Sequence, residues 1–267
     1  MGKFEHVLLV SDFDGTLNDD SGVTPPVVMD AVRYFEREGG LFAAGTGRTF
    51  QGLGTYAHND LFNAPSMLAN GALAYDLIKR KIAYFDGIGE EGLPLVREIS
   101  RRFPEISVEM YPFDETFAIH MSPETERHFT DQGIAYKHID DPAAAPRPWQ
   151  KVMLWCPGGT NVAVQRFLET KTEVSYLPTT GRFVEILARG VNKGSGVLRL
   201  ADYLGVPHER VYTAGDGYND VDMLRAAAAA FVPCNGSAEA LCAATHVVRS
   251  NNDGAVAHAI EILDQMY

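Results

Sequence analysis

The stretch from Val10 to Leu17 constrains the fold of this chain more than any other. The run before it, His6–Val10, is short, apolar and β-branched, as expected of a strand buried on both faces of a parallel sheet. It leads into Asp12, Asp14 and Gly15, and the glycine permits a sharp turn. If strand geometry persists past the run, the two carboxylates point to the same side. They would repel each other unless a cation joined them, which indicates Mg²⁺; the alternative is an ordinary acidic turn.

A second predicted strand, Leu41–Ala44, also ends in residues suited to binding an anion. Gly45 and Gly47 flank Thr46, so a hydroxyl and accessible backbone N–H groups stand together at the strand's carboxyl end. Such a group can hold a phosphoryl oxygen, although a plain turn is the simpler interpretation of these residues alone.

The last third of the chain supplies a lysine and further carboxylates. Lys193 begins a predicted helix that ends at Gly205. A cation near a helix N-terminus is unfavourable unless an anion lies beside it. The strand Val211–Ala214 runs into an acidic segment that contains Asp216, at the sheet edge where open parallel sheets bind ligands. Asp216 could complete an octahedral Mg²⁺ site begun by Asp12 and the backbone carbonyl of Asp14.

These four motifs, in this order, resemble those of the haloacid dehalogenase (HAD) superfamily of phosphohydrolases. The sequence Asn70-Gly71-Ala72 further resembles the Cof-like subfamily, which has a type IIB cap. The resemblance implies that Asp12 is the nucleophile and Asp14 the general acid/base. It also implies that Thr46, Gly47, Lys193 and Asn219 bind phosphate and that Asp12, Asp14 and Asp216 hold the metal. Asp220 would support the site and pair with Lys193, and Asn70 would lie near the substrate entrance. Arg182, in the predicted cap hairpin, is a further substrate-entrance candidate because its guanidinium offers a planar fork of donors.

The predicted fold is α/β, with a doubly wound parallel-sheet core and an inserted α+β cap. The core is expected at residues 1–85 and 186–267, and the cap at residues 86–185. The cap pattern suggests an open-faced sheet with its helices on one side. Locally, Thr24 is expected to cap the first helix through its side chain, and the alanine run 226–230 is expected to be helical.

Composition narrows the possible partners. The 267 residues have a formal net charge of −12 and a pI near 5.1, which argues against nucleic acid or an anionic membrane as a partner. A phosphorylated small molecule is still compatible, because short-range contacts outweigh a screened distant field. The three cysteines are expected to fill the core of a reduced protein, and the absence of a long apolar run favours a cytoplasmic location. The oligomeric state is left open.

The resemblance and the residues together predict a Mg²⁺-dependent phosphatase of a small metabolite, with a sugar phosphate as the favoured substrate. Two alternatives stay open: a phosphomutase of the phosphomannomutase kind, and a protein that binds a phosphorylated ligand without turnover. Substrate specificity is expected in the cap, near Arg182; the alternative for this residue is a solvent-facing position on a strand.

Overall fold

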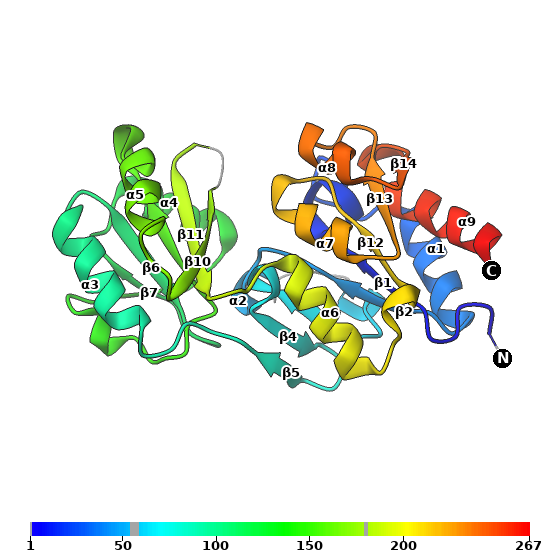
Figure 1. Cartoon of the computed structure of the whole chain (residues 1–267), viewed down its shortest axis with the longest axis horizontal. Helices are drawn as coiled ribbons and strands as arrows, with labels where there is room; N and C mark the ends of the chain where they lie inside the picture. Colours follow the sequence, from blue (N-terminus) through cyan, green and yellow to red (C-terminus); the bar gives the residue numbers. More distant parts are fainter. Residues whose placement is uncertain (1, 54–58, 179–180) are drawn as a thin grey trace. The chain divides into compact units, whose positions relative to one another are not determined.

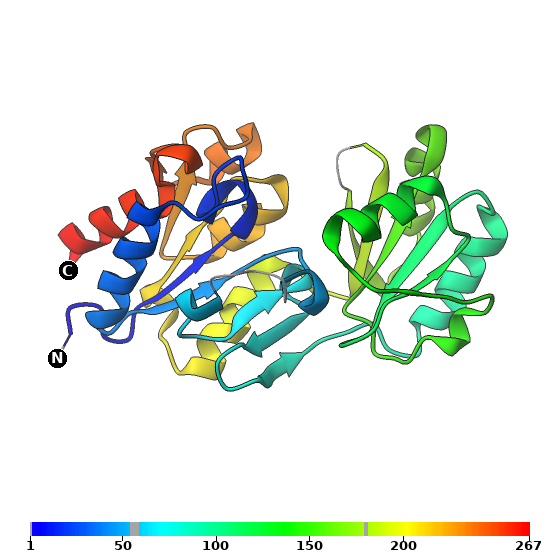
Figure 2. The ribbon, with the colours of Figure 1, turned by 180° about the vertical axis from the view of Figure 1, so that it is seen from behind.

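The computed structural model describes residues 2–53, 59–178 and 181–267, which form two compact units (Figures 1 and 2). Among the described residues, the first unit contains 2–47, 59–84 and 192–267, and the second contains 48–53, 85–178 and 181–191. Segment 48–53 therefore belongs to the second unit although it precedes the insertion. Its Phe50 N–H donates to Gln150 Oε1 at 3.2 Å, and the rings of Phe50 and Phe113 stack at 4.6 Å.

A parallel sheet of five strands, in the order β14-β13-β12-β1-β2, forms the centre of the first unit. Leu8 of β1 pairs with Val211 on one side and Leu41 on the other. The strands are short and apolar because helices cover both faces of the sheet. Their bounds are β1 Leu8–Ser11, β2 Leu41–Ala44, β12 Val211–Ala214, β13 Ala229–Pro233 and β14 His246–Val248.

Two pairs of helices cover the two faces of this sheet, which confirms the predicted doubly wound α/β class (Figure 1). The pair α6 (Lys193–Leu204) and α7 (Val221–Ala226) packs on the face of Leu8 and Val10. The pair α1 (Pro26–Arg37) and α9 (Ala255–Met266) packs together on the opposite face. Two shorter helices are α2 (Phe50–Leu53), in the second unit, and α8 (Ala238–Ala243).

A small second sheet of three strands, β3-β4-β5, completes the first unit. Its strands are β3 Ser66–Leu68, β4 Leu73–Asp76 and β5 Lys81–Phe85. A parallel bridge between Gly45 and Met67 joins it to the segment that follows β2. The sequence predicted β3, but β4 and β5 were not anticipated.

The second unit is built on a sheet of six strands, in the order β10-β11-β9-β6-β7-β8. Helices α3 and α5 pack on one face, against Val108, Val152 and Val184. Helix α4 packs on the other face, where Phe129 contacts Tyr111 and Met153, so the expectation of helices on one side only was wrong. The elements are α3 Gly92–Arg102, β6 Ser107–Tyr111, β7 Phe117–Ile119, α4 Pro123–Gln132, β8 Lys137–His138, β9 Lys151–Trp155, α5 Asn161–Leu168, β10 Val174–Pro178 and β11 Phe183–Ala188.

Two local predictions concern helices. Helix α1 begins at Pro26 with Pro25 as its N-cap residue, one residue later than expected, and the Thr24 hydroxyl donates to Asn18 Oδ1 at 2.5 Å. The prediction for the alanine run was wrong, because the run does not continue α7 beyond Ala226. From Ala229 it forms β13, because alanine's helical preference is weaker than the gain from pairing with β12 in a buried sheet.

The cysteines were only partly predicted. All three are free; Cys156 is buried as expected, whereas Cys234 and Cys242 are exposed and do not fill the core. In the described parts of the chain, no helix combines the length and apolar character needed to cross a membrane.

Candidate active site

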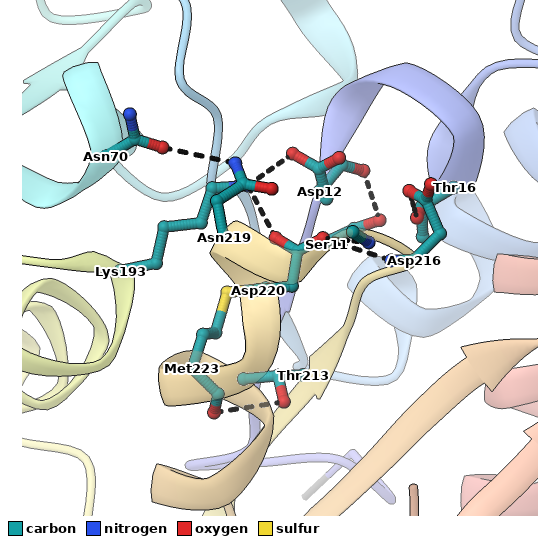
Figure 3. Close-up of polar contacts among 11 residues, drawn as sticks. Ser11, Asp12, Thr16, Asn70, Lys193, Thr213, Asp216, Asn219, Asp220 and Met223 are labelled. Carbon is teal, nitrogen blue, oxygen red and sulfur yellow. Dashed lines mark hydrogen bonds and ion pairs between the residues drawn. The ribbon is translucent and has the colours of Figure 1, made fainter. Parts of the chain in front are cut away.

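The site is built where β1 and β12 end side by side. Ser11 is paired with Ala214, and the Asp12 N–H donates to the Ala214 carbonyl at 2.7 Å. The residue after each strand is therefore held against its neighbour. This brings Asp12 close to the segment that contains Asp216, although the two are far apart in sequence (Figure 3).

The chain turns immediately after Asp12 instead of continuing as a strand. Asp12 is buried, at 8% exposed, whereas Asp14 is exposed. The expectation that both carboxylates face the same side rested on persisting strand geometry, but β1 ends at Ser11 and the chain turns at Gly15, which has φ of +78°. Among the described residues, the carboxylates that converge are those of Asp12, Asp216 and Asp220, with one oxygen of each within 4.8 Å of the others.

Gly15 and Thr16 fix the position of the Asp216 carboxylate. Gly15 has φ of +78°, and a Cβ added to it would lie 2.7 Å from Asp216 Oδ2. The adjacent Thr16 hydroxyl donates to Asp216 Oδ1 at 2.6 Å. The backbone therefore approaches this carboxylate as closely as glycine allows, which agrees with the sharp turn expected at Gly15. Thr16 was missed in the sequence, although a hydroxyl directly after an Asp-Gly turn at a strand end was a usable signal.

Lys193 lies between two carboxylates, and its pairing with Asp220 was expected. Its Nζ is 2.6 Å from Asp12 Oδ1 and 2.5 Å from Asp220 Oδ1. The residue is 1% exposed at the first position of α6, whose start is fixed by reciprocal hydrogen bonds between Asn192 and Ser195. Burial opposes the charge of the ammonium, but attraction to the two carboxylates outweighs it and raises the pKa of Lys193.

Burial destabilises the charged forms of the carboxyl groups in this site. Burial raises the pKa of Asp12, the negative charges of Asp220 and Asp216 raise it further, and Lys193 opposes the shift. Burial also raises the pKa of Asp216, against the hydrogen bond from Thr16. Two buried carboxylates, Asp12 and Asp220, and the partly buried Asp216 face one ammonium, so an additional cation would stabilise their charged forms.

Asp220 mainly organises the loop that contains Asp216. Its Oδ2 accepts the N–H groups of Asp216 at 3.0 Å and Gly217 at 2.8 Å, while its Oδ1 accepts Lys193. Since both oxygens are engaged and the residue is fully buried, Asp12 and Asp216 are the better placed to coordinate an ion. Carboxylate oxygens are the donors that hard divalent cations such as Mg²⁺ prefer, so the residues fit the predicted metal.

Asn70 connects two of the other predicted site segments. Its Oδ1 accepts a hydrogen bond from Asn219 Nδ2 at 3.2 Å, and its backbone N–H donates to the Thr46 carbonyl at 3.0 Å. A Cβ on Gly47 would lie 3.1 Å from the same Oδ1. Asn70 is 2% exposed and has φ of +54°, a conformation that asparagine tolerates better than most residues. Thr46, Gly47, Asn70 and Asn219 are thus gathered in the first unit.

Arg182, the other substrate-side candidate, belongs to the second unit. Its side chain is 74% exposed, and its Nη1 lies 3.9 Å from Glu124 Oε1. The turn before it, Thr179-Thr180, lies outside the described residues.

Comparison with known proteins agrees with this fold and these motifs. The family model for haloacid dehalogenase-like hydrolases matches residues 9–260. A Bacillus subtilis protein named "Putative phosphatase YxeH" is 26% identical, and the alignment covers 96% of this chain and 97% of that protein.

Solved structures resemble the chain over almost its whole length. A haloacid dehalogenase-like hydrolase from Bacteroides thetaiotaomicron superposes with a TM-score of 0.84 at 22% identity, covering 96% of this chain and 99% of that one. The HAD subclass IIB sugar phosphatase BT4131 gives a TM-score of 0.84 at 17% identity, covering 97% and 99%.

The chain therefore belongs to the haloacid dehalogenase-like hydrolases, which confirms the resemblance drawn from its motifs. Its relatives and structural neighbours support a phosphatase of the Cof-like kind.

Proposed function

We propose that the protein is a Mg²⁺-dependent phosphatase that hydrolyses a small phosphorylated metabolite through an aspartyl-phosphate on Asp12. The main supporting observation is the buried contact of Asp12 with Lys193, 2.6 Å apart, beside the carboxylate of Asp216. A buried carboxylate oriented by an ammonium is suited to attack phosphorus, and the same ammonium can neutralise phosphoryl oxygens as charge develops.

The other site residues have the roles that the motifs imply. The Thr46 hydroxyl and the Gly47 N–H bind phosphoryl oxygens, and Asn219, held by Asn70, stands beside them. Asp14, exposed on the turn after Asp12, protonates the leaving alcohol and then takes a proton from the water that hydrolyses the aspartyl-phosphate. When bound at Asp12 and Asp216, Mg²⁺ would supply additional positive charge against the phosphoryl oxygens.

A sugar phosphate is the proposed substrate class. One structural neighbour is described as a sugar phosphatase, and the site in the first unit consists of phosphate-binding and carboxylate groups that do not themselves select a leaving group.

The test is a panel of phosphorylated metabolites, rich in sugar phosphates, assayed for phosphate release with Mg²⁺. Asp12→Asn should abolish release from every substrate, because the amide keeps the shape of the carboxylate but cannot attack. Asp222→Asn is the matched control, since Asp222 is an exposed aspartate on α7 and should keep its activity. Turnover by Asp12→Asn, or production of an isomeric sugar phosphate without phosphate release, would contradict the proposal.

A further inference from the structure

A pocket lies wholly within the second unit, at one end of its six-stranded sheet. It is formed where β9 ends and β11 begins, together with the first turn of α4. The opposite end of β11, at Ala188, leads to the chain connection with the first unit. The pocket has a volume of about 180 Å³, far more than one water molecule needs, so it can take one small ring. Its lining includes Glu105, Glu124, Trp155 and Arg182.

Trp155 provides an aromatic wall whose orientation is fixed from behind. Its Nε1–H donates to Glu109 Oε1 at 2.7 Å, and Glu109 is fully buried. The same carboxylate accepts the hydroxyl of Tyr111 and lies 3.2 Å from His128 Nδ1. The indole also packs at 5.2 Å from the His128 ring and 5.3 Å from Phe183. A buried carboxylate with three polar partners costs free energy to desolvate, and here it holds one aromatic side chain in a defined plane.

The charged groups of the pocket have mixed signs. Arg182 and Glu124 lie 3.9 Å apart, with side chains 74% and 47% exposed, and Glu105 adds a second carboxylate. Two carboxylates against one guanidinium disfavour an anion such as phosphate, and the guanidinium disfavours a cation beside the indole. Paired donors and acceptors next to an aromatic face suit a ligand with several hydroxyl groups and no net charge.

We propose that this pocket binds the uncharged ring of a sugar, stacked on Trp155 and hydrogen-bonded by Arg182 and Glu124. The binding itself depends only on residues of the second unit. The ring could belong to the sugar part of the substrate, in which case the inference rests on the proposed function, or to a free sugar that regulates the enzyme; the two sources share this chemistry.

The intrinsic fluorescence of the full-length protein tests the proposal directly. The chain has two tryptophans: Trp155 lines the pocket, and Trp149 is fully buried elsewhere in the same unit. Trp149→Phe isolates the signal of Trp155, and the lost indole Nε1 has no hydrogen-bond partner in the structure. Titration with methyl glycosides of glucose, mannose, galactose and ribose should give a saturable change for at least one sugar, whereas inorganic phosphate should give none through Trp155.

Surface variants then test the site itself. Arg182→Met and Glu124→Gln should each weaken sugar binding at least about tenfold, the loss expected for one hydrogen bond to a charged group. The matched controls Arg127→Met and Glu126→Gln alter exposed residues of α4 outside the pocket lining and should bind normally. The absence of a saturable signal with every sugar, or equal weakening in the controls, would overturn the proposal.

The two sources are separated by kinetics. If the ring belongs to the substrate, Arg182→Met should raise KM for the best sugar phosphate far more than for p-nitrophenyl phosphate. If a free sugar regulates the enzyme, KM should be unchanged while the response of turnover to the methyl glycoside is lost. Because the fluorescence titration needs no turnover, it can also be run in Asp12→Asn, so failure of the pocket and failure of the proposed catalysis are distinguishable.

Discussion

We compare Gly15→Ala with Gly22→Ala to measure how strongly the turn after Asp12 controls the position of the Asp216 carboxylate. Both glycines have φ of +78°. A Cβ at Gly22 meets no atom within 4 Å, whereas one at Gly15 lies 2.7 Å from Asp216 Oδ2 and 3.0 Å from Cγ. The two variants therefore share the backbone penalty and differ in the contact with the carboxylate.

The structure sets the size of each effect. An alanine in the left-handed region costs about 1–2 kcal/mol, so both variants should lose about this much free energy of unfolding. At Gly15 the carboxylate must also retreat by roughly 0.7 Å to reach an ordinary contact of 3.4 Å. Mg²⁺ demands near-ideal octahedral geometry, and a misplacement of about 1 Å in a catalytic site can cost about 10²-fold in rate.

We therefore expect kcat/KM of Gly15→Ala to fall about 10²-fold. Half-maximal activity of this variant should also need a higher Mg²⁺ concentration. The kcat/KM of Gly22→Ala should stay within about twofold of the original protein's. Urea unfolding measures the stability of each variant, and phosphate release at graded Mg²⁺ measures its activity. Full activity in Gly15→Ala, or an equal activity loss in both variants, would refute the argument that the glycine is needed for approach to Asp216.

Three further predictions concern the same residues. Lys193→Met should reduce the free energy of unfolding by about 3–5 kcal/mol, because it leaves Asp12 and Asp220 buried without their cation; urea unfolding measures this, and an unchanged midpoint would contradict it. Saturating Mg²⁺ should raise the thermal midpoint of the original protein but not of Asp216→Asn, and EDTA should abolish turnover until Mg²⁺ is restored; equal midpoints with and without Mg²⁺ would remove the metal from the scheme. Asp14→Asn should slow phosphorylation of Asp12 by a sugar phosphate far more than by p-nitrophenyl phosphate, whose leaving group needs no proton; equal slowing of this first step in rapid-quench single turnovers would exclude a general-acid role.

The strands and helices that surround the site were predictable because their signals are local. Apolar runs such as Leu41–Ala44 match a strand buried in a parallel sheet, and Lys193 and Gly205 do bound α6 as expected. The alanine run was not predictable in this way, because only pairing with β12 makes residues 229–230 extended. The face on which α4 packs is likewise decided by contacts with distant strands.

The candidate site shows the same division. Asp12, Lys193 and Asp220 could be named from their motifs, and the structure brings them into contact. The exposure of Asp14 could not be predicted, because it depends on where β1 ends and the turn begins. Thr16 was missed because its contribution is a contact with Asp216, which lies 200 residues away in sequence.

The central claim is that Asp12 attacks phosphorus, and trapping its phosphorylated form tests that claim most directly. A ³²P-labelled substrate from the panel can be mixed with the enzyme, quenched in acid within milliseconds and followed by peptide mapping. We expect label on the peptide that contains Asp12, formed and lost at rates at least as fast as turnover, and no label in Asp12→Asn. Continued turnover without labelled protein, or label on any other residue, would contradict the account.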